Sequence, residues 1–339
     1  MQKFKVGVIG LHMGREHLIA YQKSEHFEVI GICDVNKDLL EKMPEADRIP
    51  IKSINYMDLV NNDNIDLISV ASPDHFHREH LIAALEAGKH VLCEKPLALT
   101  MDDCREIVET AKKSKSKFMI GQVCRFAPGF KMAKGIINNG LIGDLFFIES
   151  EYAHDYKNIP GWEGWRKDPK VSRNGVIGGG CHAIDLLRWI GGEVEEVSAY
   201  ANHKMLKDWP QPDTTVAILK FKENQIIGKV FVSIAVQRRY TMRSVFYGSE
   251  GTIICDNISS NIKLYSNKIP GLKNFSKLPV HVASHDVASE VEYFYQCLIG
   301  KQKLELDVVE GANTVAVGLA IVESAKNSGK PSRVILFQR

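Results

Sequence analysis

The first third of the chain alternates short apolar runs with longer segments in which apolar residues recur every three or four positions. Short runs bounded by turn residues are typical of buried strands, and the longer periodic segments are typical of helices. The expected strands cover residues 6–10, 27–33, 65–71, 91–93 and 118–121. Strands that alternate with helices predict a doubly wound parallel sheet with right-handed crossovers.

After Gln122 we expect a linker at residues 125–128. Beyond it the pattern changes to apolar–polar alternation, which predicts strands with one buried face. These strands cover residues 146–152, 215–221, 226–235, 244–247 and 252–255. Their close succession favours antiparallel pairing, and residues 248–251 resemble a hairpin connection. We therefore expect an α/β chain of two domains, 1–122 and 123–339, the second with a large, mostly antiparallel open sheet whose final helices could pack back on the first domain.

Composition excludes several classes of function. The 339 residues are 45% hydrophobic and 25% charged, which is ordinary for a globular protein of two domains. A net charge of +2 gives no electrostatic footprint for nucleic acid or an anionic membrane. No apolar run has the length of a membrane span, and the N-terminus shows no signal-peptide pattern.

The chain contains seven cysteines, an odd number, and no Cys-x-x-Cys pair. This pattern argues against a disulfide framework and against a structural zinc site, so we expect no metal. A reducing cytoplasm is the compartment that such cysteine usage fits best.

A strand, a glycine turn and a helix follow one another at residues 6–20. This is the context that a dinucleotide-binding fingerprint requires, because the helix N-terminus offers N–H groups to a pyrophosphate. The residues expected at the cofactor are Gly10, Leu11, His12, Met13 and Gly14. His12 stands near the place of the second glycine and could crowd the pyrophosphate, so a plain strand–helix turn is an equal alternative.

Asp34 follows the second strand, 24 residues after Gly10. An acidic residue at this distance can accept hydrogen bonds from the adenosine ribose hydroxyls and would repel a 2′-phosphate. The sequence therefore favours NAD over NADP. The alternative role for Asp34 is to cap the helix that begins near Lys37.

The segment 88–96 combines a helix-ending glycine, a buried strand and the sequence Glu94-Lys95-Pro96. Ligands bind at the carboxyl ends of strands in an open α/β sheet, where we expect the loops 10–14, 72–77 and 94–96 to converge. Further candidates for cofactor contact are Ser72, Pro73, His77, Glu94 and Lys95. The alternative is a solvated surface pair of Glu94 and Lys95.

A second cluster of candidate residues lies in the strand-rich half. A glycine-rich segment, 175–181, leads into a helix on which His182 and Asp185 share a face. We expect His182 to be exposed to a cleft and to titrate near neutral pH, although a capping or packing histidine is the alternative. Aromatic faces and cations in the loop 162–168 suit hydroxyl-rich rings or anionic groups. The candidates to line such a site are Tyr152, His154, Trp165 and Arg166.

The chain resembles the Gfo/Idh/MocA family, the relatives of glucose–fructose oxidoreductase and inositol dehydrogenase. The residues that carry the resemblance are Val8-Ile9-Gly10, Gly14, His17, Pro73, His77, the segment 87–96, Arg125-Phe126, Pro128, Gly140, Ile142-Gly143, the segment 178–182 and Asp185. The resemblance implies an N-terminal Rossmann domain and a C-terminal domain whose open sheet forms a homodimer or homotetramer. It also implies hydride transfer between NAD or NADP and a secondary alcohol of a sugar, cyclitol or sugar derivative.

The chain departs from the family pattern at Gly178, where inositol dehydrogenase-like members have an aspartate four positions before the active-site histidine. A Lys-Asp-His set is thereby reduced to Lys95 and His182. Lys95 would hold the substrate oxygen as an ammonium, and His182 would remove the hydroxyl proton. Glu94 would orient Lys95, and Asp185 would orient His182 or bind its own helix.

Two other classes of function are compatible with the same residues. The chain could be a lyase or hydrolase that uses NAD without net redox change on a sugar, or a catalytically silent regulatory protein that binds NAD or a sugar. The presence of both Lys95 and His182 favours an enzyme.

Overall fold

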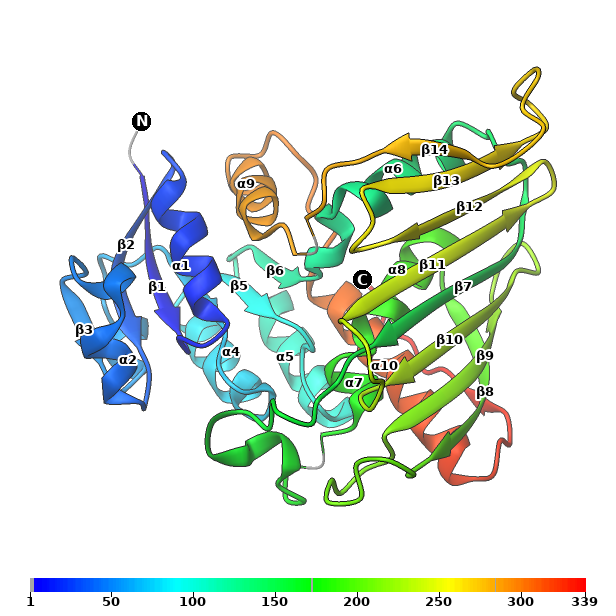
Figure 1. The fold of residues 1–339 in the computed structure, drawn as a ribbon. Helices are drawn as coiled ribbons and strands as arrows, with labels where there is room; N and C mark the ends of the chain where they lie inside the picture. Colours follow the sequence, from blue (N-terminus) through cyan, green and yellow to red (C-terminus); the bar gives the residue numbers. More distant parts are fainter. Residues whose placement is uncertain (1–2, 172, 284) are drawn as a thin grey trace. The chain divides into compact units, whose positions relative to one another are not determined.

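The computed structural model describes residues 3–171, 173–283 and 285–339 (Figure 1). Contacts between Cα atoms divide the chain into two compact units. The first unit comprises Met1–Gln122, Val287–Asn313 and Phe337–Arg339, and the second comprises Val123–Asp286 and Thr314–Leu336. The first unit is therefore built from segments that lie far apart in the sequence.

The first unit contains a six-stranded parallel sheet in the order β3-β2-β1-β4-β5-β6. Its strands are β1 (Phe4–Ile9), β2 (Phe27–Cys33), β3 (Ile51–Ser53), β4 (Leu67–Val70), β5 (His90–Glu94) and β6 (Phe118–Gly121). The predicted doubly wound parallel sheet is confirmed. The three-residue β3 was not predicted, because its sequence Ile-Lys-Ser is too short and too polar to form an apolar run.

Two pairs of helices pack together in the first unit. The helices of this unit are α1 (Gly14–Lys23), α2 (Lys37–Lys42), α3 (Met57–Val60), α4 (His77–Glu86), α5 (Met101–Lys113) and α9 (Val287–Leu298), with short 3-10 turns at Pro44–Ala46 and Asp74–Phe76. Helix α4 packs on α5, and α1 packs on α9, where the rings of His26 and Tyr295 stack with centroids 3.7 Å apart. The strand order reverses between β1 and β4, so right-handed crossovers place α1 and α4 on opposite faces of the sheet.

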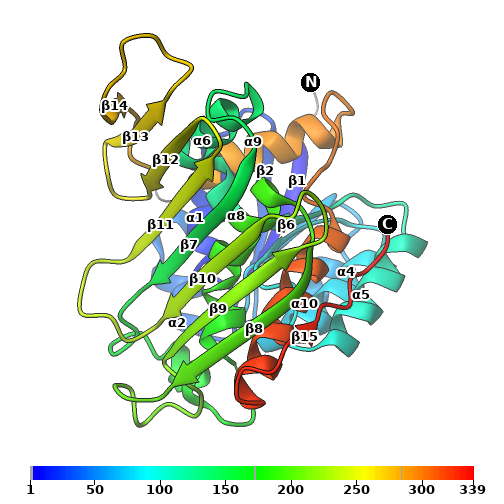
Figure 2. The same cartoon turned by 90° about the vertical axis from the view of Figure 1, so that its right-hand side faces the viewer.

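The second unit contains a nine-stranded sheet in the order β14-β13-β12-β11-β7-β10-β9-β8-β15, which Figure 2 shows broadside. Its strands are β7 (Leu145–Ala153), β8 (Val194–Asn202), β9 (Thr214–Phe221), β10 (Ile227–Ser233), β11 (Thr241–Gly248), β12 (Gly251–Asp256), β13 (Asn261–Ser266), β14 (Ser276–Pro279) and β15 (Ser332–Arg333). All neighbouring pairs are antiparallel except β7 with β10. The predicted large, mostly antiparallel sheet is confirmed.

Helices of the second unit cover one face of this sheet. They are α6 (Pro128–Asn138), α7 (Gly175–Gly178) and α8 (Cys181–Gly191), with 3-10 turns at Val123–Phe126 and Trp162–Lys167. Helix α8 packs on β7 and β10, and α6 packs on β12. The turn Val123–Phe126 corrects the expectation of a linker at residues 125–128, because all four of its residues are buried. Burial is possible there because the charge of Arg125 is matched by a buried carboxylate, described below.

Helix α10 (Val308–Lys326) begins in the first unit and continues in the second. It is the one helix among the described residues that is long and apolar enough to cross a membrane, with a mean hydropathy of 1.3. Of its most apolar stretch of 18 residues, 72% is buried inside the structure. The core helix of a globular protein has the same properties, so length and composition are weak evidence for a membrane span.

Candidate active site

Two glycines shape the turn after β1. Gly10 has a φ of +86°, and a Cβ atom added to it would lie 2.5 Å from the backbone nitrogen of Ser72. Only glycine therefore lets the loop after β1 approach the loop after β4 so closely. A Cβ on Gly14 would lie 2.9 Å from Cγ1 of Val8, so this glycine lets α1 pack tightly on β1. His12 is exposed, and the arrangement fits a dinucleotide at the start of α1.

The carboxylate of Asp34 holds this turn in place. Its Oδ2 accepts a hydrogen bond from the backbone N–H of Leu11 at 2.7 Å, and its Oδ1 accepts one from Asn36 at 2.8 Å. The helix that follows is capped by the side chain of Asn36, which accepts from the backbone N–H of Asp38. The alternative in which Asp34 caps this helix is therefore wrong. Each carboxylate oxygen can still accept a further hydrogen bond, as a ribose hydroxyl would require.

His77 joins the loop after β4 to the loop after β5. Its Nε2 lies 3.0 Å from the carbonyl oxygen of Ser72, and its Nδ1 lies 2.8 Å from the carbonyl oxygen of Pro96. The side chain is fully buried. Together with the contact of Gly10 against Ser72, this confirms that the three carboxyl-end loops of the first unit converge.

Lys95 follows β5 at this same edge, and a chain of polar side chains supports it. Ser69 Oγ lies 2.9 Å from Nδ1 of His17, whose Nε2 lies 3.0 Å from Oε1 of Glu94. Oε2 of Glu94 lies 3.9 Å from Nζ of Lys95, and the Glu94 side chain is only 7% exposed. The carboxylate is therefore fixed by a buried histidine and positions the ammonium. His17 is the member of this chain to which the sequence analysis gave no role.

His182 begins the second group of candidate residues, all of them in the second unit. It is only 2% exposed, so the expectation of a histidine exposed to a cleft is wrong. Its Nδ1 lies 3.4 Å from Sγ of Cys124, and its ring stacks on that of Tyr152 with centroids 6.4 Å apart. Packing between these groups, rather than helix-end exposure, sets the environment of the imidazole.

Tyr152, near the end of β7, is the centre of an aromatic group that includes His154 and Tyr156. Its hydroxyl lies 2.8 Å from the hydroxyl of Tyr156 and 3.0 Å from Nδ1 of His154. Burial, followed by the neighbouring Tyr156, raises the pKa of Tyr152 well above its usual value of 10. Tyr152 is therefore a neutral phenol that can donate a proton in a hydrogen bond near pH 7.

Asp185 belongs to a buried ion pair. Its two carboxylate oxygens accept hydrogen bonds from Nε and Nη2 of Arg125 at 2.7 and 2.6 Å. Thr314 Oγ1 lies 3.4 Å from the same carboxylate. A bidentate pair of this kind is among the stronger polar contacts in proteins. It balances the charge of Asp185 and ties helix α8 to the turn at Val123–Phe126.

Arg173 occupies the space beside Gly178. A Cβ atom on Gly178 would lie 2.0 Å from Cζ of Arg173, so the guanidinium fills the place where a side chain would point. Arg173 lies over the rings of Tyr156 and Trp165 at 5.9 and 5.3 Å. Arg166 also lies over Trp165, at 5.1 Å, and donates to the carbonyl of Ile159. The aromatic group is thus bordered by two cations.

Several residues at these places were not among the sequence candidates: His17, Cys124, Tyr156 and Arg173. Two more are Tyr240, whose ring lies 5.4 Å from that of Tyr152, and His285, whose ring lies 5.4 Å from that of His182. The sequence contained a signal for only one of these residues, Tyr156. Residues 152, 154 and 156 are spaced by two, so they share a face of an extended strand and Tyr156 could have been predicted with the other two. The rest come from segments whose contact no local pattern shows.

Comparisons with known proteins decide the family. Residues 4–122 match the model of an oxidoreductase family with an NAD-binding Rossmann fold, and residues 130–254 match the GFO/IDH/MocA C-terminal domain. The chain belongs to the Gfo/Idh/MocA family. The resemblance stated from the sequence is confirmed, and the first unit carries the NAD-binding Rossmann domain of this oxidoreductase family.

Within the Gfo/Idh/MocA family, the chain is 30% identical to myo-inositol 2-dehydrogenase of Thermotoga maritima, over 75% of each chain. It is 31% identical to levoglucosan dehydrogenase of Pseudarthrobacter phenanthrenivorans, over 59% of this chain. The chain spans about half the length of several of the curated relatives it matches, 54% for this one. A solved structure of levoglucosan dehydrogenase with NADH has the same fold, with a TM-score of 0.89 at 22% identity over 99% of this chain and all of that one.

Proposed function

We propose that this protein transfers a hydride between NAD and a secondary alcohol of a sugar, cyclitol or sugar derivative. The observation that carries the proposal is the convergence of three loops at the carboxyl edge of an NAD-binding sheet, with Lys95 held at that edge by Glu94. Relatives named as inositol and levoglucosan dehydrogenases support the substrate class.

The nicotinamide of bound NAD supplies the hydride acceptor. In the proposed reaction the Lys95 ammonium donates a hydrogen bond to the substrate oxygen and stabilises negative charge as the alkoxide develops. Glu94, anchored by His17, keeps this ammonium in place. The imidazole of His182, whose Nδ1 lies beside Cys124, would accept the hydroxyl proton. Tyr152, as a neutral phenol, would donate to a substrate oxygen.

The proposal is tested with Lys95→Ala and His182→Ala, assayed with a panel of sugars, polyols and inositols. Turnover, followed at the nicotinamide absorbance, should fall by about 10²–10⁴ in each variant, because each removes a positioned acid, base or cation. NADH binding, followed by fluorescence titration, should stay nearly unchanged.

Matched controls for this pair are the exposed residues Lys115 and His281. Lys115→Ala and His281→Gln should keep both turnover and NADH binding. If His182→Ala retains more than about a tenth of the turnover, far above the loss expected for a removed base, His182 is not the proton-transfer group.

We also propose a preference for NAD over NADP, set by Asp34. Asp34→Ala should weaken NAD binding by roughly tenfold to a hundredfold, which is the loss expected for a charge-assisted hydrogen bond. The variant should also show a smaller difference between its affinities for NAD and NADP. Part of the loss would come from the turn, because Asp34 also accepts from Leu11. Asp38→Ala, four residues on and exposed, is the control that should change neither affinity. Equal binding of NADP and NAD by the unmodified protein would overturn this assignment.

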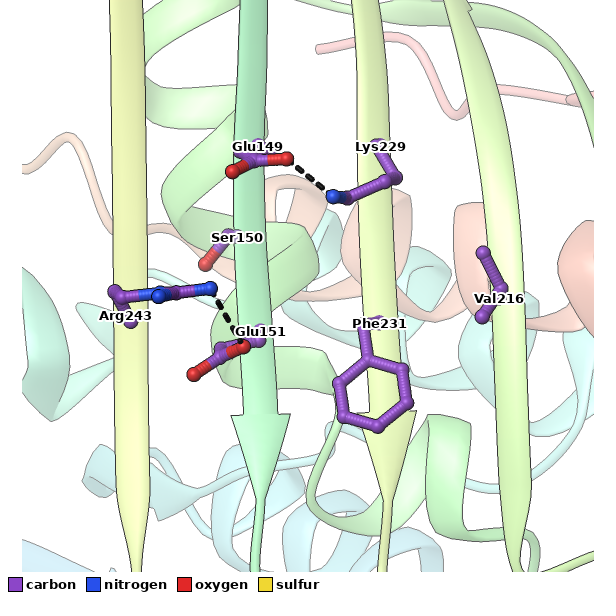
Figure 3. A pocket seen from close by; sticks show the side chains of 7 residues that line it. All are labelled: Glu149, Ser150, Glu151, Val216, Lys229, Phe231 and Arg243. Atoms are coloured by element: carbon purple, nitrogen blue, oxygen red, sulfur yellow. Dashed lines mark hydrogen bonds and ion pairs between the residues drawn. The ribbon is translucent and has the colours of Figure 1, made fainter.

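We propose further that a second copy of the chain covers the open face of the nine-stranded sheet, the face opposite α6 and α8. Cross-strand partners on this face are apolar in part: Phe231 lies beside Val216, and Ile218 lies beside Lys229. Val216 and Ile218 are 40% and 47% exposed. Figure 3 shows this surface, where a hollow of about 260 Å³ lies between two ion pairs, Glu149 with Lys229 and Glu151 with Arg243. Neighbouring ion pairs and apolar side chains of this kind suit a specific homo-oligomer contact.

A further inference from the structure

Three side chains with metal-binding atoms come together in the second unit. Cys124 lies in the turn Val123–Phe126, His182 begins α8, and His285 lies in the segment before α9. One ligand atom from each, Sγ or a ring nitrogen, lies within 4.8 Å of the other two. The sequence analysis expected no metal because Cys-x-x-Cys is absent, but the fold brings these donors together from positions far apart in the sequence.

The distances suit a tetrahedral ion. With bonds of about 2.3 Å to sulfur and 2.0–2.1 Å to nitrogen, a tetrahedral zinc site places its sulfur about 3.6 Å from each nitrogen. Sγ of Cys124 lies 3.4 Å from Nδ1 of His182, so these two atoms already have nearly that spacing. The third donor must move inward by only an ångström or so, and His285 is exposed and can adjust.

The donor set selects the kind of ion. A cysteine thiolate with two imidazoles binds soft or borderline ions and disfavours Mg²⁺ and Ca²⁺, which prefer oxygen. Sδ of Met242 lies 3.5 Å from Sγ of Cys124 and adds a second soft atom to the surroundings. Tyr240, whose hydroxyl lies 3.4 Å from Nε2 of His285, helps to orient that ring.

We propose that Cys124, His182 and His285 form a binding site for a thiolate-seeking metal ion, Zn²⁺ or Cu⁺. Binding replaces the thiol proton of Cys124 by a metal–sulfur bond and releases that proton to solvent. The exposed His285 gives the ion a path from solvent to the two buried ligands. No electron transfer is involved, because both ions enter in the oxidation state in which they are bound.

The site has a consequence for turnover that rests on the proposed function. A metal on Nδ1 of His182 leaves the ring proton on Nε2, so this nitrogen can no longer accept a proton from a substrate hydroxyl. The metal should therefore act as a reversible inhibitor of alcohol oxidation, and a chelator should restore turnover.

The binding test uses the full chain with the metal alone. The chelator-treated protein is titrated with Zn²⁺ against a chromogenic competitor, with Cu⁺ under reducing conditions, and with Co²⁺, whose thiolate charge-transfer absorption reports a cysteine ligand. Cys124→Ser and His285→Asn should each weaken Zn²⁺ or Cu⁺ binding by at least about 100-fold, and Cys124→Ser should abolish the Co²⁺ band. His281→Gln, an exposed histidine of the same segment, should bind as the unmodified protein does.

Two outcomes would overturn the proposal: neither Zn²⁺ nor Cu⁺ binds at micromolar concentration, or binding is unchanged in Cys124→Ser and His285→Asn. Mg²⁺ should show no competition, and effective competition by Mg²⁺ would also count against a soft site. The effect of the metal on turnover is measured in a separate experiment. Binding that depends on Cys124 and His285 but leaves turnover unchanged supports the metal site and contradicts His182 as the base.

Discussion

At the scale of single residues, two adjacent glycines in the second unit make room for side chains of very different stiffness. Gly179 lies against Tyr152, and a Cβ there would be 2.4 Å from Cζ of the buried ring. Gly178 lies against the end of the long Arg173 side chain, and a Cβ there would be 2.0 Å from Cζ of Arg173. A buried ring whose hydroxyl is hydrogen-bonded cannot move aside easily, whereas the end of an arginine can rotate.

This difference gives a matched pair of variants. Gly179→Ala should lower the free energy of unfolding by about 1–3 kcal/mol, as overpacking of a core does, and should reduce turnover by displacing Tyr152. Gly178→Ala should lower the free energy of unfolding by clearly less, since the end of the Arg173 side chain can shift. Urea unfolding of both variants provides the measurement. Equal losses in the two variants would mean that the Tyr152 ring is not the rigid neighbour.

At the scale of elements, helix α4 carries a buried histidine that links the fold to pH. His80 is 8% exposed, and its Nδ1 lies 2.9 Å from Ser72 Oγ. Burial, followed by the nearby His77, lowers the pKa of His80 from 6.5 to about 4. The folded chain therefore holds this ring neutral at a pH where the unfolded chain would protonate it. The contribution of His80 to the free energy of unfolding is therefore fully present above pH 6.5 and is lost as the pH falls toward 4.

The size of this effect can be predicted. A change from pH 7 to pH 5 should cost about 2 kcal/mol of unfolding free energy through His80 alone, as linkage between these two pKa values requires. His80→Gln should remove most of that pH dependence, and the exposed His281→Gln should not. Urea unfolding at the two pH values measures how much the free energy of unfolding changes with pH in each variant. An unchanged slope in His80→Gln would assign the acid sensitivity to other groups.

Prediction from the sequence succeeded where a local pattern carried the information. The bounds of β2 and β6 agree with their apolar runs, since turn residues close each run. The burial of His182 beside Cys124 was missed because the two are 58 positions apart and only the fold joins them. Arg125 was assigned to a linker because the sequence does not show that Asp185 neutralises it.

At the scale of the whole molecule, the open face of the nine-stranded sheet is the surface through which we propose that two copies of the chain associate. Ile218→Glu adds a carboxylate to the face that we propose a second copy covers, and its cross-strand neighbour Lys229 is already paired with Glu149. The homodimer or homotetramer should therefore dissociate to a particle near 38.0 kDa. Sedimentation at micromolar concentration measures this. Ile54→Glu, at a position of the first unit that is 55% exposed, should leave the assembly intact. A monomeric unmodified protein would refute the second copy.

The scattered segments of the first unit have a consequence for synthesis on the ribosome. Helix α1 buries Leu18 and Tyr21, and it packs on α9, which is complete only about 275 residues later. At the usual rate of about 5–20 residues per second, translation takes roughly 14 to 55 s to cover that distance. During this interval the Rossmann sheet of the nascent chain lacks one of its covering helices. Those seconds are when the newly made protein is most open to chaperone binding or to aggregation.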